Sequence, residues 1–211
     1  WEWNFRRGEG PQVQESQVVA PALDPEVIAR MITAAREGIL TAEEAAYLAF
    51  ATTYGTRREE LAGLGHESNI DLHGLTAYIA TVKHGRARTH MLPPQIVPIL
   101  GRHDFSPQSL SHLQTVWYLT EYRSGFNHVP QVGWHSIRRT LATLLLDSLP
   151  EVTVSSFLRW KHASSPNMPF RYSAVRFVGF DGSTTRVFGE AQEVDQKVFA
   201  VHPFLPLWEG Q

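Results

Sequence analysis

Most of the chain carries the apolar spacing of amphipathic helices, and one stretch in its first half breaks that spacing. Residues 70–83 are rich in Thr, Tyr, Ile and Val, which are typical of strands. Lys83-His-Gly-Arg86 then predicts a turn into a second strand that ends at Pro93-Pro94. Because helical spacing returns beyond this stretch, the sequence predicts a mainly α fold with a small antiparallel β-sheet, of the α+β class.

Capping residues mark where the predicted helices begin. Asp24-Pro25-Glu26 places Pro at the first helical position, and Thr41-Ala-Glu-Glu44 has the pattern of a capping box. Further helices are predicted over residues 94–100, 106–124, 135–149 and 154–160, with Pro150 ending the third of them.

The two ends of the chain differ from its body. Residues 1–22 mix Gly, Pro, Gln and Glu without apolar periodicity, which predicts a partly flexible linker or arm. Residues 175–188 alternate around Asp181-Gly182, which indicates a hairpin, and an apolar tail follows. We therefore expect one domain over residues 23–174, and a C-terminal β-hairpin with its tail over residues 175–211. Because the chain starts with Trp and has no leader pattern, we expect it to be a fragment.

Composition excludes several classes of protein and site. The 211 residues contain no cysteine, which excludes a disulfide framework, a Cys-liganded zinc and a thiol nucleophile. No apolar run approaches the roughly 18 residues that a membrane-spanning helix needs. The ten histidines show no metal-ligand spacing such as His-Glu-x-x-His, so we expect no metal site. A cytoplasmic protein that does not enter membranes is the simplest interpretation.

Charge is unevenly distributed along the sequence. The net charge of −2 gives no sign of nucleic-acid binding, but residues 83–176 hold eleven Lys or Arg against four acids, a local charge of +7. The rest of the chain therefore sums to −9. A basic middle between acidic ends is compatible with binding to DNA phosphates.

Five short motifs follow one another between residues 54 and 172. They are Tyr-Gly-Thr-Arg57-Arg-Glu-Glu60-Leu, Thr-Val-Lys83-His-Gly, Trp134-His135-Ser-Ile-Arg138, Phe157-Leu-Arg-Trp160 and Met168-Pro-Phe-Arg-Tyr172. Singly, each has an ordinary structural explanation. In this order, over more than half of the chain, they resemble the catalytic domain of the tyrosine recombinase (phage integrase) family, which would make residues 23–174 that domain.

One motif departs from the family pattern. The family usually places its tyrosine about nine residues after a His or Trp that follows a Leu-Gly pair, whereas Tyr172 lies twelve residues after Trp160. The connection is then longer than usual. Alternatively, His162 fills the third His/Trp position and the connection is nearly standard.

The resemblance implies metal-independent cleavage of a DNA phosphodiester. Tyr172 would be the nucleophile that forms a 3′-phosphotyrosine intermediate, and Arg57 and Arg138 would hold the non-bridging oxygens through guanidinium hydrogen bonds. His135 would act as the base. No metal, nucleotide or organic cofactor is expected.

Other matched residues would complete this site. Lys83 would protonate the leaving 5′ oxygen, although Arg86 or Arg88 could replace it, and Trp160 or His162 would add a donor to the phosphate. Glu60 would be a buried supporting carboxylate. DNA contacts are expected from Arg86, Arg88, Arg139, Lys161 and Arg171.

The resemblance also implies partners. We expect double-stranded DNA as the substrate, association with the nucleoid of a prokaryotic or viral system, and a tetramer on DNA, with a monomer as the alternative in solution. The tail residues Phe204, Leu205, Leu207 and Trp208 would dock on a neighbouring protomer. Two other functions stay open, namely type IB topoisomerase-like relaxation of DNA and a catalytically silent DNA-binding module.

Overall fold

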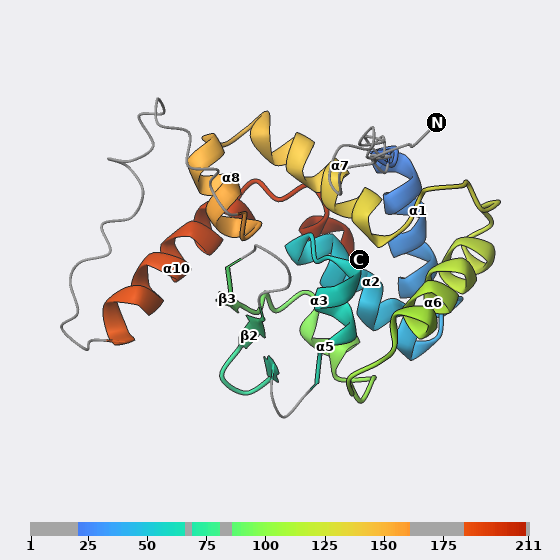
Figure 1. Ribbon diagram of the computed structural model, residues 1–211, viewed down its shortest axis with the longest axis horizontal. Helices are drawn as coiled ribbons and strands as arrows, with labels where there is room; N and C mark the ends of the chain where they lie inside the picture. The colour runs from blue at the N-terminus through green and yellow to red at the C-terminus, as the bar shows by residue number, and fades with distance from the viewer. Residues whose placement is uncertain (1–20, 66–68, 81–85, 161–183, 210–211) are drawn as a thin grey trace, which may run out of the picture.

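A computed structural model describes residues 21–65, 69–80, 86–160 and 184–209 of the chain (Figure 1). Its helices are α1 (Pro25–Arg36), α2 (Ala42–Tyr54), α3 (Arg58–Ala62), α5 (Val97–Leu100), α6 (Leu110–Arg123), α7 (Trp134–Leu146), α8 (Glu151–Phe157), α10 (Thr184–Phe199) and the 3-10 helix η1 (Leu205–Trp208). Its strands are β1 (Ile70–Asp71), β2 (Thr76–Ile79) and β3 (Arg88–Met91).

Helix α2 runs through the centre of the domain and is almost entirely buried. The predicted capping box is present at its start: Thr41 Oγ1 accepts from the Glu44 N–H at 3.2 Å, and the Glu44 carboxylate accepts from the Thr41 N–H at 3.0 Å. Helices α1, α3, α5, α6 and α7 pack around α2 together with η1 (Figure 1). A helix that is apolar on all sides belongs in a core, and α2 positions the elements that follow it.

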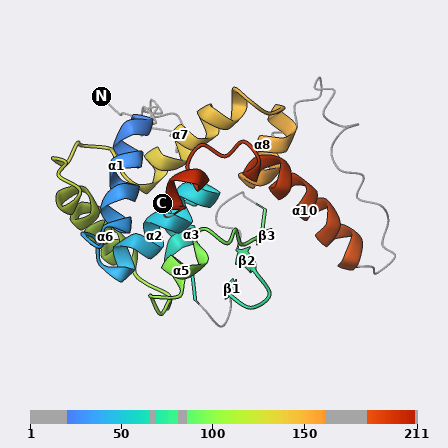
Figure 2. The ribbon, with the colours of Figure 1, turned by 180° about the vertical axis from the view of Figure 1, so that it is seen from behind.

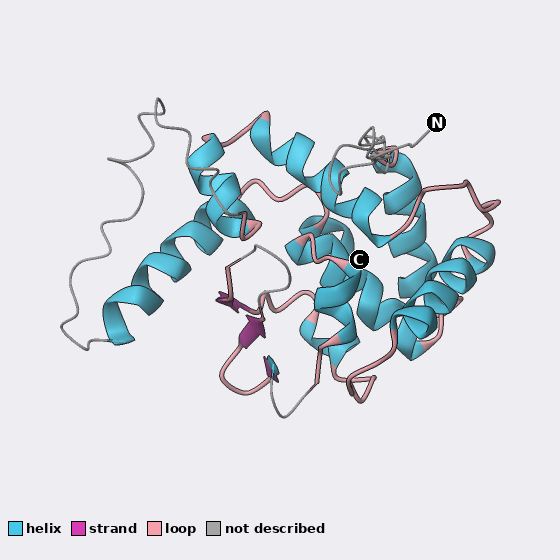
Figure 3. Cartoon of the chain, viewed as in Figure 1, coloured by secondary structure: helices cyan, strands magenta, loops and turns pink. Residues whose placement is uncertain are grey.

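The sheet has three antiparallel strands in the order β1-β2-β3 (Figure 3). Ile70 lies opposite Ala77 in the first pair, and Tyr78 lies opposite Thr89 in the second. The prediction of a mainly α fold with a small antiparallel sheet is therefore confirmed. Most of the turn predicted at residues 83–86 lies outside the described residues.

The C-terminal region differs from the prediction. Residues 184–188 belong to helix α10, not to the second strand of a hairpin, and residues 175–183 lie outside the described residues. The apolar residues Ala191, Val194 and Val198 recur at helical spacing, which the alternation around Asp181-Gly182 obscured. Helix α10 packs against β3 and α8 (Figure 1).

The apolar tail is also corrected by the structure. Phe204, Leu205 and Trp208 are buried in the chain's own core, where η1 packs on α1 and α2 (Figure 2). Leu207 packs against the same core, and Trp208 Nε1 donates to Thr52 Oγ1 at 3.1 Å. These side chains already have partners within the chain and are not available for docking on a neighbouring protomer.

Within the described ranges, every helix is too short or too polar to cross a lipid bilayer.

Candidate active site

Arg57 and Glu60 form a pair at the start of α3. Helix α2 ends at Tyr54 with Gly55 as its C-cap, which has a φ of 56°, and Arg57 then occupies the N-cap of α3. The Arg57 N–H donates to Glu60 Oε2 at 2.9 Å, and its guanidinium donates to Glu60 Oε1 at 2.8 Å. Glu60 is buried whereas the Arg57 side chain is 21% exposed. Glu60 therefore holds Arg57 from the protein interior, and the other side of the guanidinium faces solvent.

Arg138 reaches the same place from α7. Its two amino groups donate to the carbonyl oxygens of Gly55 and Leu158, so one guanidinium bridges the ends of α2 and α8. A Cβ at position 55 would lie 2.8 Å from Leu158 Cδ2, which is too close, and the positive φ adds to the need for glycine. Burial, with the nearby cations Arg159 and Arg57, lowers the pKa of Arg138 to about 9, which still leaves it charged at pH 7.

His135 lies one turn before Arg138 near the start of α7, and its side chain is exposed. Partial desolvation, followed by the charges of Arg138 and Arg57, lowers the pKa of this imidazole. A histidine with a lowered pKa is neutral at pH 7 and can accept a proton. The same interactions indicate that Arg57, Arg138 and His135 share one electrostatic environment.

Trp160 joins this cluster at the end of α8. It is half-buried, and the Arg138 guanidinium carbon lies 6.0 Å from the centroid of its ring. Four of the predicted catalytic residues, Arg57, His135, Arg138 and Trp160, are therefore brought together, with Glu60 supporting them. Lys83, Lys161, His162, Arg171 and Tyr172 lie outside the described residues.

The predicted DNA-binding arginines divide into two groups. Arg86 and Arg139 are exposed, and the Arg86 N–H donates to the Arg159 carbonyl at 3.3 Å. Arg88 is different, because its guanidinium donates to Asp195 Oδ1 at 2.7 Å, to the Ala191 carbonyl at 2.7 Å and to Ser156 Oγ at 2.9 Å. With a side chain only 10% exposed, Arg88 ties α10 to β3 and α8, so its assignment to DNA contact or to acid catalysis is corrected.

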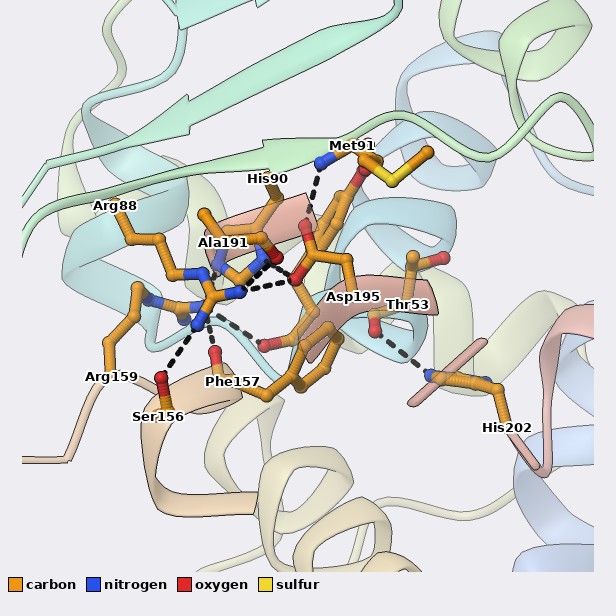
Figure 4. A network of polar contacts seen from close by, with 11 residues as sticks. Thr53, Arg88, His90, Met91, Ser156, Phe157, Arg159, Ala191, Asp195 and His202 are labelled. Atoms are coloured by element: carbon orange, nitrogen blue, oxygen red, sulfur yellow. Dashed lines mark hydrogen bonds and ion pairs between the residues drawn. The ribbon is translucent and has the colours of Figure 1, made fainter. Parts of the chain in front are cut away.

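A buried polar network lies beside the cluster, and the sequence patterns did not predict it (Figure 4). His90 Nδ1 lies 3.1 Å from Asp195 Oδ1, and its Nε2 lies 3.1 Å from an Arg159 amino group. Asp195 Oδ2 also accepts from the Met91 N–H at 2.7 Å. Desolvation lowers the pKa of His90 to about 4, so the ring is neutral. An Nδ1–H tautomer then satisfies both contacts, since it donates to Asp195 and accepts from Arg159.

Arg159 connects this network to the cluster. Its second amino group donates to Glu60 Oε2 at 2.8 Å, so Glu60 holds both Arg57 and Arg159. Only one sequence signal pointed to Arg159: it stands where the Leu-Gly-His/Trp pattern has its glycine. His90 and Asp195 gave no such signal, because they lie 105 residues apart.

The cluster and the network together carry an excess of positive charge. Four arginines, Arg57, Arg88, Arg138 and Arg159, face two carboxylates, Glu60 and Asp195, while His90 is neutral. These side chains therefore sum to +2. Since Arg57 is the most exposed of the four arginines, this excess favours an anion at its outer side.

In the part of the chain that the structure describes, no three His, Asp or Glu side chains lie close enough together to hold a metal ion.

Comparisons with known proteins support the fold. No family model matches the sequence, and no curated protein matches it. Among solved structures, the chain is similar to the crystal structure of XerA recombinase, with a TM-score of 0.53 and 18% sequence identity over 80% of this chain. The chain spans 64% of the length of that protein. At this identity, the likeness establishes a recombinase-like fold.

Proposed function

We propose that this chain is the catalytic domain of a tyrosine-type site-specific DNA recombinase. The observation that carries the proposal is that Arg138 of α7, one turn from His135, donates to the Gly55 carbonyl two residues before Arg57, so the three side chains converge on one site. These residues come from the first and third ordered motifs, 78 or more residues apart in sequence, and the fold brings them together. The recombinase-like fold supports the proposal independently.

In the proposed reaction, the Tyr172 hydroxyl attacks the phosphorus of a DNA strand. Its unperturbed pKa is about 10, so His135, which is neutral, would take the proton. Arg57 and Arg138 would bind the non-bridging oxygens, with Trp160 or His162 as a further donor. The bond to the 5′ oxygen breaks as the phosphotyrosine bond forms, and Lys83 would protonate the departing oxygen. A 5′ hydroxyl of another strand reverses these steps and completes the exchange.

The proposal extends to the setting of the reaction. The substrate would be double-stranded DNA, contacted by Arg86 and Arg139 and by Lys161 and Arg171. A tetramer would assemble on DNA in the cytoplasm, in association with the nucleoid. Because the tail is buried in its own core, we expect the contacts between protomers to involve other residues.

A covalent adduct tests the proposal. The chain is incubated with a pool of nicked duplexes of randomised sequence, and protein linked to DNA is recovered under denaturing conditions and sequenced. We expect a recurrent sequence joined through a 3′ phosphate. Tyr172→Phe should form no adduct, while Tyr122→Phe, an exposed tyrosine on α6, should form it normally. No adduct with the parent chain, or adduct with Tyr172→Phe, would contradict the proposal.

One observation favours a catalytically silent DNA-binding module instead. Arg138 is 2% exposed and already donates to two backbone carbonyls, so it serves as a structural bridge without a phosphate. These two bonds use two of the five N–H donors of the guanidinium, and the other three remain for a phosphate if the site is catalytic. Salt-sensitive DNA binding without any adduct would support this second function. Relaxation of arbitrary supercoiled plasmid would point instead to topoisomerase-like activity.

A further inference from the structure

Arg159 has a backbone conformation that an arginine rarely adopts. Its φ is 60°, in the left-handed region, where it occupies the position after the C-cap of α8. The Trp160 N–H donates to the Ser155 carbonyl at 2.9 Å and the Arg159 N–H to the Ser156 carbonyl at 3.2 Å, which together form a Schellman motif. Glycine is the usual residue at this position, and another residue costs about 1–2 kcal/mol.

The side chain of Arg159 compensates for this strain through buried contacts. Its guanidinium is fully buried and donates to Glu60 Oε2 at 2.8 Å, to His90 Nε2 at 3.1 Å and to the Tyr54 carbonyl at 3.3 Å. A strained residue persists where its surroundings hold it firmly, and such residues concentrate at functional sites. Glycine would form the turn without strain but could make none of these contacts.

The contacts of Arg159 reach the Arg57 side of the cluster through Glu60. Burial alone would raise the pKa of the Glu60 carboxyl, but the charge of Arg159 and the bond from the Arg57 N–H lower it overall, so Glu60 is ionised. The ionised carboxylate accepts the Arg57 guanidinium on its other oxygen. Arg159 thus stabilises the acceptor that orients Arg57.

The same turn sets the other side of the cluster. Trp160 follows Arg159 directly and packs near Arg138, and the Leu158 carbonyl, one residue before Arg159, accepts from Arg138. The conformation of Arg159 therefore fixes three consecutive residues, of which Leu158 and Trp160 contact Arg138 and Arg159 contacts Glu60.

We infer that Arg159 is a positioning residue that holds Arg57, Arg138 and Trp160 in the geometry that binds a phosphate group. This inference rests on the proposed function for its role in catalysis. Its structural part, the binding of a phosphate oxyanion at Arg57 and Arg138, is testable without any DNA reaction.

The test uses two variants and one control in the full chain. Arg159→Gly keeps the left-handed turn and removes the guanidinium, whereas Arg159→Lys keeps a positive charge without the planar fork that spans Glu60 and His90. Arg58→Gln removes a neighbouring charge that bonds to Gln114 and not to Glu60, so it controls for the loss of charge alone.

The first measurement is the affinity for inorganic phosphate. Phosphate is titrated into the protein, and the NMR signal of the exposed His135 ring reports binding. We expect Arg159→Gly and Arg159→Lys to weaken binding by roughly 10- to 100-fold, by analogy with metal sites, where removing the hydrogen-bond partner of a ligand has an effect of that size. Arg58→Gln should stay within about twofold of the parent chain, because its charge is partly screened. Phosphate affinity of both Arg159 variants within that same margin would overturn the inference.

The second measurement is single-turnover adduct formation on the recovered DNA, alongside DNA affinity. Both Arg159 variants should form adduct more slowly by a similar factor, with DNA affinity unchanged, which a loss of folded protein would not produce. If Arg159→Gly does not fold, Arg159→Lys decides, and adduct formation at the parent rate overturns the inference. If the parent chain forms no adduct, the proposed function fails, while the phosphate titration still decides the role of Arg159.

Discussion

Arg57 and Arg159 bind the same carboxylate from opposite sides, yet their environments differ sharply. The Arg57 side chain is 21% exposed and that of Arg159 is fully buried, although each has an amino group 2.8 Å from a Glu60 oxygen. Arg159 has further contacts to His90 and to backbone carbonyls, whereas Arg57 faces the surface. Glu60 therefore separates an open group of residues, Arg57 and His135, from a closed network of Arg159, His90 and Asp195.

The difference between the two groups has a physical consequence. A buried ion pair is costly to break, because the remaining charge cannot be hydrated, whereas an exposed arginine can exchange its partner for water or for a phosphate. Changes in the closed network should therefore affect stability first, and changes in the open group should affect chemistry first. Three sets of measurements test this division.

The largest effect is expected for Asp195→Ala. Asp195 is fully buried, and its loss leaves the His90 ring and the Met91 N–H without their acceptor and the Arg88 guanidinium without its counter-charge. The free energy of unfolding, measured by urea denaturation, should fall by about 3–5 kcal/mol. Glu193→Ala is the control, since Glu193 is an exposed residue of the same helix that pairs with Lys197. Equal urea midpoints for Asp195→Ala and Glu193→Ala would show that the closed network does not stabilise the fold.

Arg57→Ala should show the opposite balance. Glu60 keeps its bond to Arg159, so we expect a stability loss of no more than about 1 kcal/mol. The rate of adduct formation should fall by about 10²–10³-fold, as for the loss of one donor to a transition-state oxyanion. Arg58→Ala on the same helix is the control. A stability loss for Arg57→Ala as large as that of Asp195→Ala would erase the distinction between the two groups.

Acid should destabilise the folded chain through its buried histidines. Desolvation lowers the pKa of His90 and of His202 from 6.5 to about 4. Between these values the unfolded chain binds protons that the folded chain does not, so stability is present above pH 6.5 and is lost as pH falls to about 4. For one histidine the loss between pH 7 and pH 4 is roughly 3 kcal/mol.

His202→Asn separates the two histidines. His202 Nδ1 accepts from the N–H groups of Phe204 and Leu205, and an Asn oxygen can replace that acceptor without titrating. Urea denaturation at pH 7 and pH 4 should show roughly 3 kcal/mol less acid sensitivity in the variant than in the parent chain. The acid sensitivity that remains comes from the other groups with shifted pKa values, among them His90 in the closed network. Unchanged acid sensitivity in the variant would exclude His202 as a source.

Local sequence patterns predicted the helical body and the sheet well. The Thr41 capping box, the strand-rich stretch from residue 70 and the helix that carries His135 and Arg138 all depend on neighbours within a few residues. The order of the motifs also predicted that Arg57, His135, Arg138 and Trp160 would meet.

The C-terminal region shows where local patterns fail. An Asp-Gly pair within an alternating segment is typical of hairpins, but the structure has a helix from Thr184, which packs against β3 and α8 and pairs Asp195 with Arg88. Likewise, the apolar tail was compatible with docking on another protomer. Only the packing of Phe204 and Trp208 against α1 and α2 decided that it stays in its own core.

Sequence patterns predicted the helices up to α8, the presence of a sheet and the residues of the open group, because periodicity, capping and motif order are local or ordered properties. Tertiary structure alone decided the closed network. Arg88 and Asp195 lie 107 residues apart, and Arg159 and Glu60 lie 99 residues apart. Whether a charged side chain is buried against a partner or free to meet a phosphate depends on the packing of distant segments, and no local pattern records that packing.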